Sequence, residues 1–211
     1  INMTKLRPFR FGLEVGGAAS RQEWVEKARK AEDLGLSTIL MEDHLFCALA
    51  PLAAMMAAAD STTSLRIGTY VLGNDFRHPV VLAKEISTLC HLSQNRFVFG
   101  VGPGWYAREY EVTGSRIEER GKRTDEIIEA VTLLLTKKNA SFDGQYYKFR
   151  DVTVDPRPPR LPQREDRRQL PGELQREPLP LQVRPAIAHL DGGLEEVHGG
   201  RTDEPGDEHV G

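Results

Sequence analysis

Four short apolar segments recur at nearly constant intervals in the first 156 residues, and each is followed by a helix-like segment. They begin at Phe9, Thr38, Arg66 and Phe97, so the intervals are 29, 28 and 31 residues. Strands that alternate with helices in this way are typical of a parallel sheet, because parallel strands need a long crossover connection. Right-handed crossovers wind such a sheet in one direction. The pattern predicts an α/β fold, and both a (β/α)₈ barrel and an open doubly wound sheet fit it.

Helix start and stop signals delimit the segments between these strands. Ser20 and Glu23 of "SRQEWVEKARKAEDLG" form a capping box, and Gly35 ends that helix. Pro51 and Pro79 open the next two helices, since proline is favoured at the first helical position. A fourth helix is expected in "EERGKRTDEIIEAVTLLLTKK". Apolar residues at helical spacing predict the buried faces: Trp24, Ala28, Ala31 and Leu34 in the first helix, Leu82, Ile86 and Leu89 in the third, and Ile127, Val131 and Leu134 in the fourth.

A hairpin and a missing phosphate motif complete the outline of this part of the chain. The segment "ASFDGQYYKF" is typical of a β-hairpin that turns at Asp143-Gly144. A doubly wound sheet would lead us to look for G-x-G-x-x-G after the first strand. The sequence after Val15 is "GGAAS", so a dinucleotide site of that kind is disfavoured. We assign residues 1–156 to one α/β domain.

The composition changes after Pro156. Residues 157–211 contain no aromatic residue and no Met, Lys, Ser, Asn or Cys, and they hold eight of the 13 prolines. They also hold 8 Arg and 11 acidic residues, a balance of 8 − 11 = −3, which is the net charge of the whole chain. Such a segment buries too little apolar surface to offset its ordering entropy. We predict that this Arg/Pro/Glu/Gly-rich tail is disordered.

Charge and cysteine content argue against several classes of function. A net charge of −3 gives no indication of binding to nucleic acid or to an anionic membrane. Cys47 and Cys90 are too few for a disulfide framework and match no zinc pattern. Each is therefore expected to be a small buried residue, and no metal site is predicted. We expect neither a membrane span nor a secretory leader, and hence a cytoplasmic protein.

Three of the predicted strands end in residues that can take part in chemistry. Asp43 and His44 follow the second strand in "MEDHLF", the third strand ends in "YVLGND", and the fourth ends in "GVGPGWY". Ligands of parallel α/β folds gather at the carboxyl ends of the strands, so we expect these groups to form one site. Alternatives stay open at this point. Asp43-His44 can be an ordinary loop pair, and Gly102 and Gly104 can make only a tight turn, with Trp105 covering the core.

Three longer motifs stand out: "EDHLF", "IGTYVLGNDFRHPVVLAKEISTLCHLSQNRFVFGVGPGW" and "ERGKRTDEIIEAVTLL". Together they resemble the luciferase-like monooxygenase superfamily of (β/α)₈ TIM barrels. With the opening "RPFRFGLE", they are most similar to the branch that uses the deazaflavin coenzyme F420. The resemblance covers Arg7 to Pro156. It implies an oxidoreductase that transfers a hydride between F420 and a small organic substrate, with an FMN-dependent monooxygenase as the alternative.

The resemblance assigns roles to residues at the strand ends. His44, beside Asp43, is expected next to the flavin-type ring, where it would act as a catalytic acid or base. Glu109 is a weaker catalytic candidate, since "YAREYE" is also typical of a solvated helix start. The bond between Tyr70 and Val71 is expected to be a cis peptide that faces the ring, although a regular trans strand is the simpler alternative. The other implied contacts are to the cofactor from Gly102, Pro103, Gly104 and Trp105, and to phosphate from Arg77 and His78, for which a helix cap is the alternative.

Two departures limit what the resemblance implies. The glucose-6-phosphate dehydrogenases of this family place a proton-donating glutamate after the strand-four "GxG", where this chain has Trp105, which argues against a sugar-phosphate substrate. The family also continues with four βα units that close the barrel and hold the cofactor phosphate, whereas "DPRPPRLP" begins that passage and then loses the pattern. We hypothesise a shifted reading frame after codon 156. The chain would then be a truncated non-catalytic remnant, a homodimer that covers its open sheet, or a weak binder of the cofactor ring.

Overall fold

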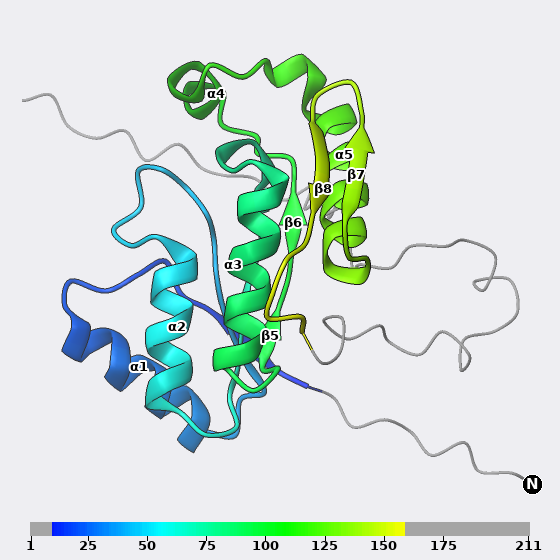
Figure 1. Ribbon diagram of the computed structural model, residues 1–211. Coiled ribbons are helices and arrows are strands. Elements are labelled where there is room, and N and C mark those ends of the chain that lie inside the picture. The colour runs from blue at the N-terminus through cyan, green and yellow to red at the C-terminus, as the bar shows by residue number, and fades with distance from the viewer. Residues whose placement is uncertain (1–9, 159–211) are drawn as a thin grey trace, which may run out of the picture.

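The computed structural model describes residues 10–158, in which strands and helices alternate as predicted (Figure 1). The predicted tail lies outside the described residues, apart from Arg157 and Pro158. The third and fourth strands of the sequence pattern are each divided in two. In chain order the strands and α-helices are β1 (Gly12–Glu14), α1 (Arg21–Asp33), β2 (Thr38–Met41), α2 (Pro51–Ser61), β3 (Arg66–Thr69), β4 (Leu72–Gly73), α3 (Pro79–Leu92), β5 (Phe97–Val98), β6 (Val101–Gly102), α4 (Ala107–Thr113), α5 (Arg120–Thr136), β7 (Ala140–Asp143) and β8 (Lys148–Val152).

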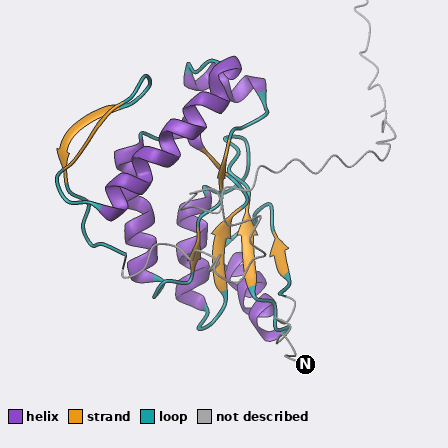
Figure 2. Cartoon of the chain, turned by 90° about the vertical axis from the view of Figure 1, so that its right-hand side faces the viewer, coloured by secondary structure: helices purple, strands orange, loops and turns teal. Residues whose placement is uncertain are grey.

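Strands β1, β2, β3 and β5 form a parallel sheet whose spatial order follows the chain. Helices α1, α2 and α3 pack side by side, with α5 next to α3 (Figure 1, Figure 2). A second parallel pair, β4 with β6, continues the third and fourth strands. A doubly wound sheet reverses its strand order at a switch point. No reversal occurs within residues 10–158, so the α/β prediction is confirmed and the sheet winds in one direction, as a barrel does.

The core lies between the sheet and its helices. Ile39 and Met41 of β2 are fully buried, while the alternating residue Leu40 is only half-buried on the other face. That other face is therefore only partly covered by the residues that the structure describes. The predicted buried faces of α3 and α5 are confirmed, because their residues are at most 5% exposed: Leu82, Ile86, Leu89, Ile127, Val131 and Leu134.

Helix α1 begins as predicted but ends differently. The Ser20 side chain accepts a hydrogen bond from Glu23 N, and the Glu23 carboxylate accepts one from Ala19 N, one residue before the cap. The burial predicted for Leu34 is wrong, because its side chain is 69% exposed. Leu34 is the C-cap residue, and the chain turns away at Gly35 with a φ of +74°, so the inner face ends one turn earlier. The other predicted inner residues are buried: Trp24, Ala28 and Ala31.

The two cysteines differ in burial. Cys90 is buried in α3, as predicted for a small apolar residue. Cys47 is only half-buried, so the same prediction is wrong for it. It lies in the loop after β2, where its thiol donates to Glu42 Oε1 at 3.4 Å. Burial, together with the negative charge of Glu42, raises the pKa of the Cys47 thiol.

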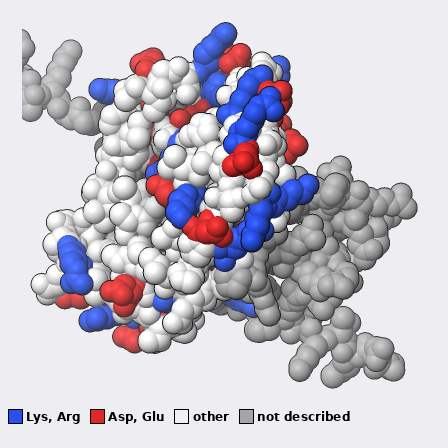
Figure 3. All heavy atoms as spheres, viewed as in Figure 1, with Lys and Arg blue, Asp and Glu red and all other residues white. Residues whose placement is uncertain are grey.

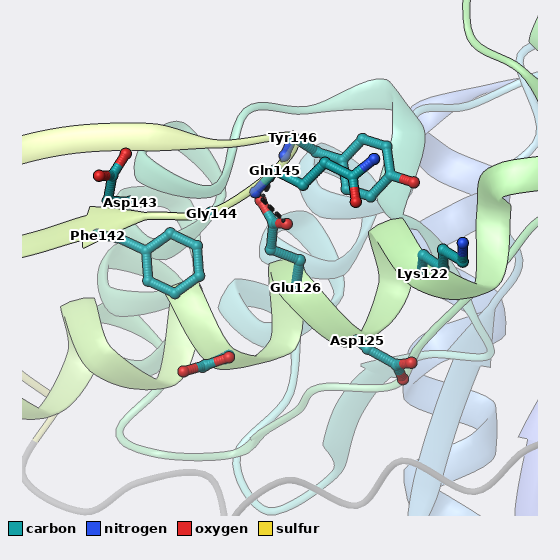
Figure 4. A pocket seen from close by; sticks show the side chains of 9 residues that line it. Lys122, Asp125, Glu126, Phe142, Asp143, Gly144, Gln145 and Tyr146 are labelled. Carbon is teal, nitrogen blue, oxygen red and sulfur yellow. Dashed lines mark hydrogen bonds between the residues drawn. The ribbon is translucent and has the colours of Figure 1, made fainter.

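Strands β7 and β8 form the predicted antiparallel hairpin, but its turn is longer than expected. Asp143 pairs with Lys148, so the loop consists of residues 144–147 rather than turning at Asp143-Gly144. The reason lies outside the hairpin. The Glu126 carboxylate on α5 accepts hydrogen bonds from the backbone N–H groups of three successive loop residues, Gln145, Tyr146 and Tyr147. Figure 4 shows the bonds from Gln145 and Tyr146.

Helix α5 and the hairpin loop border an open hollow (Figure 4). None of the residues that line it belongs to the predicted site, so the hollow does not coincide with that site. The lining residues are Lys122, Asp125, Glu126, Glu129, Phe142, Asp143, Gly144, Gln145 and Tyr146.

The surface carries charges of both signs. Basic and acidic side chains lie next to one another on the face shown in Figure 3, and much of that face is uncharged. Within residues 10–158, no helix combines the length and the apolar composition that a membrane crossing requires.

Candidate functional site

His44 and Glu109 meet beyond the carboxyl ends of the strands. His44 lies in the loop that follows β2, and Glu109 lies in the first turn of α4. His44 Nδ1 is 3.1 Å from each carboxylate oxygen of Glu109, and Leu45 N donates to Glu109 Oε1 at 2.8 Å. Because Glu109 is 1% exposed, protein groups rather than bulk water satisfy its carboxylate. The two residues predicted as catalytic candidates are therefore in direct contact.

This contact decides which nitrogen of His44 is available for chemistry. An ionised carboxylate only accepts hydrogen bonds, so it selects the tautomer in which Nδ1 carries the proton. Nε2 is then the nitrogen that can accept or return a proton. Glu42 Oε2 lies 3.8 Å from Nε2, which is a long distance for an ion pair. The arrangement is that of an imidazole oriented by a buried carboxylate.

Asp43 has a different environment from its neighbour His44. Its Oδ2 accepts hydrogen bonds from Gly73 N at 3.0 Å and from Arg77 Nη1 at 2.6 Å, and its side chain is 4% exposed. Both partners follow β3 in the chain, so Asp43 ties the end of β2 to β4 and to the approach to α3. Its direct contact with a cofactor stays a prediction, and its observed contacts are with protein groups.

The contacts of Arg77 and His78 favour the helix-cap alternative over a phosphate site. The Arg77 guanidinium lies between two carboxylates, with its Nε 3.5 Å from Glu85 Oε2 and its other nitrogens on Asp43. His78 Nδ1 accepts a hydrogen bond from Val80 N and caps α3. The Arg77 guanidinium and His78 Nδ1 are thus engaged by the protein itself.

The peptide bond between Tyr70 and Val71 is cis, as the resemblance implied. It separates β3 from β4, which explains why the third strand of the sequence pattern is divided. Tyr70 is 50% exposed, whereas Val71 lies against β6. A Cβ built on Gly102 would lie 3.0 Å from Val71 Cγ2, so glycine at this position permits the close approach. The contact of this peptide bond with a cofactor ring stays a prediction.

The loop after β6 presents an aromatic side chain to solvent. Trp105 is 73% exposed, so it does not cover the core of the described residues. Its ring meets the His44 ring edge-on at a centroid distance of 5.9 Å. The loop is held by Tyr110, whose hydroxyl donates to the Gly104 carbonyl at 2.9 Å. Burial, and next the charge of Asp75, raises the pKa of Tyr110 to about 12, so this hydroxyl keeps its proton.

Four further residues at this edge received no individual role in the sequence analysis, although Phe46 and Tyr106 lie inside two of its motifs. Phe46 and Tyr106 are exposed aromatic residues in edge-on contact, and the Arg108 guanidinium lies 5.2 Å from the Phe46 ring centroid. Glu14 ends β1, and its pKa is raised by burial and, secondly, by the charge of Glu42. All four lie at or within a few residues of a predicted strand end, and that position is the signal that could have identified them.

The described part of the chain holds no group of three or more His, Cys, Asp or Glu side chains arranged to bind a metal ion. What the edge offers instead is an oriented His–Glu pair, the cis peptide bond of Tyr70 and Val71, and exposed aromatic side chains. A parallel α/β sheet that winds in one direction, with these groups beyond its strand ends, is the arrangement of an α/β barrel. The predicted residues that gather there are Asp43, His44, Tyr70, Val71, Gly102, Pro103, Gly104, Trp105 and Glu109.

Comparison with known proteins identifies the family within this class. The family described as "Luciferase-like monooxygenase" matches residues 4–171, and the chain belongs to it. The chain is 36% identical over 162 residues to a protein of Amycolatopsis mediterranei (strain U-32) described as "F420-dependent glucose-6-phosphate dehydrogenase". That match covers 69% of this chain and 49% of the relative. The chain thus spans about half the length of the curated relatives it matches.

Solved structures share the fold. The monooxygenase RslO1 from Streptomyces bottropensis matches with a TM-score of 0.68 and 26% identity, over 73% of this chain and 51% of that chain. The oxygenating constituent of 3,6-diketocamphane monooxygenase from Pseudomonas putida, in complex with FMN, matches with a TM-score of 0.60 and 19% identity, over 68% of this chain and 43% of that chain. The second likeness shows the fold alone. The predicted family and its TIM-barrel fold class are confirmed.

Proposed function

We propose that this chain carries the ring-binding and proton-transfer site of an F420-dependent oxidoreductase, which transfers a hydride between F420 and a small organic substrate. One observation carries the proposal: the oriented His44–Glu109 pair lies beyond the carboxyl ends of the same parallel sheet from which Tyr70 and Val71 continue. The relative from Amycolatopsis mediterranei, which is described as F420-dependent, supports this cofactor.

The residues at this edge fit a flat deazaflavin ring. Tyr70 is 50% exposed, and Gly104, in the loop after β6, is half-buried and carries no side chain. Gly102 lies against Val71, and the Gly104 carbonyl is fixed by Tyr110. We assign the ring contacts to Tyr70 and Val71 and to residues 102–105.

A bound deazaflavin supplies an obligate hydride carrier. The protein's own contribution is to bind, to orient and to move a proton. A substrate that is oxidised by loss of a hydride also loses a proton, and His44 Nε2 is the group placed to accept it. Glu109 keeps the other proton on Nδ1 and stabilises the imidazolium that forms, since its buried carboxylate lies 3.1 Å from that nitrogen. Asp43, held by Arg77, fixes the loop that carries His44.

FMN is the second candidate cofactor. The same backbone surface would accept an isoalloxazine ring, and the 3,6-diketocamphane monooxygenase constituent, which has this fold, is described in complex with FMN. In that case the chain would belong to an FMN-dependent monooxygenase. A non-catalytic remnant is the third reading, and the titration below separates it from the other two.

The test is an equilibrium titration of the purified 211-residue chain with F420 and with FMN, followed by cofactor fluorescence, while circular dichroism confirms the fold. We expect saturable binding of F420 that weakens about tenfold, or about 1.4 kcal/mol, in His44→Ala. His91→Ala is the matched control, because His91 is exposed in the last turn of α3. Tighter binding of FMN favours the second candidate. Absence of binding by a folded chain overturns the proposal and favours the remnant.

The remaining expectations concern partners and location. A small-molecule substrate is part of the proposal, and a homodimer that covers the open face of the sheet is a further prediction, which sedimentation velocity measures directly. Neither nucleic acid nor a membrane is expected as a partner. A cytoplasmic location stays a prediction, to be checked by fractionation.

A further inference from the structure

Arg123 is a buried cation that the proposed proton transfer does not use. It lies in the first turn of α5, and its side chain is 8% exposed. Its Nε donates to Asp75 Oδ1 in the short 3₁₀ turn Asn74–Phe76 after β4, and the Asp75 side chain is 3% exposed. Glu119 Oε2, 3.6 Å from Nη1, is a second and more exposed partner. Because taking two charges out of water costs free energy, a buried pair of this kind is weak evidence for a role in stability alone.

The Arg123 guanidinium also contacts the segment that carries Glu109. Its Nη2 donates to the Arg116 carbonyl, in the loop after α4. Its central carbon, Cζ, lies 6.0 Å from the ring centroid of Tyr110 on α4, at the outer end of the range in which a cation is attracted to an aromatic ring. Arg123 therefore links α5 both to α4 and to the loop that follows α4.

Helix α4 depends on such contacts for its position. It has seven residues, and a helix of this length is not stable by itself in water. Its two buried residues are Glu109, which contacts His44, and Tyr110, whose ring is near Arg123. The Tyr110 hydroxyl also donates to the Gly104 carbonyl at 2.9 Å. Tyr110 thus fixes α4 against α5 and against the loop after β6, while Glu109 reaches the loop after β2.

The contact between Glu109 and His44 tolerates little movement of α4. The carboxylate oxygens lie 3.1 Å from His44 Nδ1. A displacement of about 0.5 Å would take them beyond the range of a hydrogen bond. Glu109 and Tyr110 are adjacent in one short helix, so a rotation of α4 that moves the ring also moves the carboxylate. The position of the carboxylate therefore depends on the group against which Tyr110 packs.

We propose that Arg123 is a positioning residue for the proposed proton transfer. Paired with Asp75, it holds Tyr110 and with it α4. The Glu109 carboxylate then stays on His44 Nδ1, and Nε2 stays the nitrogen without a proton on the neutral ring. Arg123 acts through α4 and is assigned no contact with cofactor or substrate. The inference rests on the proposed function, because it names a residue that prepares the proposed proton acceptor.

The experiment reads the tautomer of His44 by nitrogen-15 NMR of the histidine-labelled 211-residue chain without cofactor. The signals of His44 are identified by their absence from His44→Gln. Arg123→Lys keeps a charged partner for Asp75 but loses the planar group that reaches both Asp75 and the Arg116 carbonyl. We expect the Nδ1-protonated tautomer in the wild type and a mixture of tautomers in this variant. Asp75→Asn, which keeps the shape of the carboxylate and removes its charge, should shift the tautomers in the same direction.

Arg96→Lys is the matched control. Arg96 is half-buried directly before β5, where its guanidinium donates to the carbonyls of Leu65 and Ala59. This is the amino end of the sheet, opposite to the site, so Arg96→Lys should lower the free energy of unfolding and leave the tautomer of His44 unchanged. Circular dichroism and urea unfolding establish that each variant is folded under the conditions of the NMR measurement.

Two outcomes overturn the inference. One is a single Nδ1-protonated tautomer in both folded variants, Arg123→Lys and Asp75→Asn. The other is the same mixture of tautomers in Arg96→Lys, which would trace the effect to lower stability alone.

F420 binding is measured separately from its own fluorescence, and we expect Arg123→Lys to weaken it. If the tautomer changes as expected but F420 does not bind to the wild type, Arg123 is upheld as the residue that positions Glu109 on His44, and the proposed function fails. If F420 binds to the wild type and the tautomer stays single in both variants, the inference alone fails.

Discussion

The imidazole of His44 and the carboxylate of Glu109 are 65 positions apart in the sequence, and His44 Nδ1 is 3.1 Å from both carboxylate oxygens. The relationship predicts that the ring exists as the Nδ1-protonated tautomer when neutral. In Glu109→Ala we expect a mixture of tautomers, because the acceptor that selects one of them is gone. Nitrogen-15 NMR of labelled histidine measures the tautomer directly. An unchanged spectrum in Glu109→Ala would mean that Glu109 does not position His44.

Glu109→Ala also tests whether Glu109 stabilises the fold. Glu109→Gln separates this structural role from the positioning of His44. Glu109 is buried and accepts the backbone N–H of Leu45. Glu109→Ala leaves that donor without a partner and should cost about 1–3 kcal/mol of unfolding free energy. Glu109→Gln keeps an acceptor of similar shape and should lose less. Urea unfolding of both variants gives the comparison.

The ion pair between Asp43 and Arg77 should contribute strongly to stability. The Asp43 side chain is 4% exposed and that of Arg77 is 17% exposed. Arg77→Met leaves a buried carboxylate without its charged partner, and removing one member of such a pair costs about 3–5 kcal/mol. The double substitution Arg77→Met with Asp43→Asn should recover part of that loss. A loss of stability in the double variant equal to the sum of the two single losses would show that the residues are not coupled.

An exposed ion pair provides the control for this prediction. Lys148 Nζ lies 2.9 Å from Asp143 Oδ1, but both side chains are more than 60% exposed. Surface pairs of this kind contribute little, since water screens them. Lys148→Met should therefore leave the unfolding free energy unchanged within error.

The lowered pKa of Glu32 predicts how the stability of the fold depends on pH. Burial acts against ionisation, but hydrogen bonds from the backbone N–H groups of Ser64, Leu65 and Thr63 outweigh it and lower the pKa of Glu32 from 4.5 to about 2. A carboxyl whose pKa is lower in the folded state contributes stability above its unfolded pKa and loses it as the pH falls. The difference in stability between the wild type and Glu32→Gln should be constant above the unfolded pKa of 4.5 and shrink as the pH falls towards 2. Urea midpoints measured across this range check it, and a difference that stays constant down to pH 2 contradicts it.

Gly100 should tolerate no side chain. A Cβ at this position would overlap the carbonyl oxygen of Thr69, whose hydroxyl also donates to the Gly100 carbonyl at 2.7 Å. Gly100→Ala should therefore destabilise the fold by about 1–3 kcal/mol, the usual cost of overpacking. Gly121→Ala is the matched control, because Gly121 lies in α5 and a Cβ there would meet nothing within 4 Å. This substitution should raise the free energy of unfolding by about 0.4–1 kcal/mol. Equal effects of the two variants, measured by thermal unfolding, would contradict the prediction.

Much of the fold could be predicted because its signals are local. Strand spacing, the Ser20 cap, and the prolines that open α2 and α3 act within one or two turns of chain, and the structure has the elements where these signals predict them. The burial of Leu34 was predicted wrongly. Leu34 lies at the end of α1, and a periodic pattern does not show that the chain turns away there. The hairpin turn was misjudged because Glu126, some twenty residues upstream, holds the loop open.

The site could be predicted only in outline. Strand ends place His44 and Trp105 at one edge, since that follows from the parallel topology. The partner of His44 depends on the angle at which α4 leaves the fourth strand, and no short-range signal encodes that angle. Phe46 and Arg108 pair through tertiary contact for the same reason. The tail beyond residue 158 lies outside the described residues, so its predicted disorder is not tested.

The hairpin β7–β8 pairs with no other strand in the part of the chain that the structure describes, and three of its loop N–H groups end on the single carboxylate of Glu126. Such a unit can detach and return while the four-stranded sheet stays intact. We therefore expect the amide protons of residues 145–147 to exchange with solvent through this local opening, and faster in Glu126→Ala. Such a result would mean two levels of cooperativity in the domain, one for the sheet with its helices and a lower one for the hairpin.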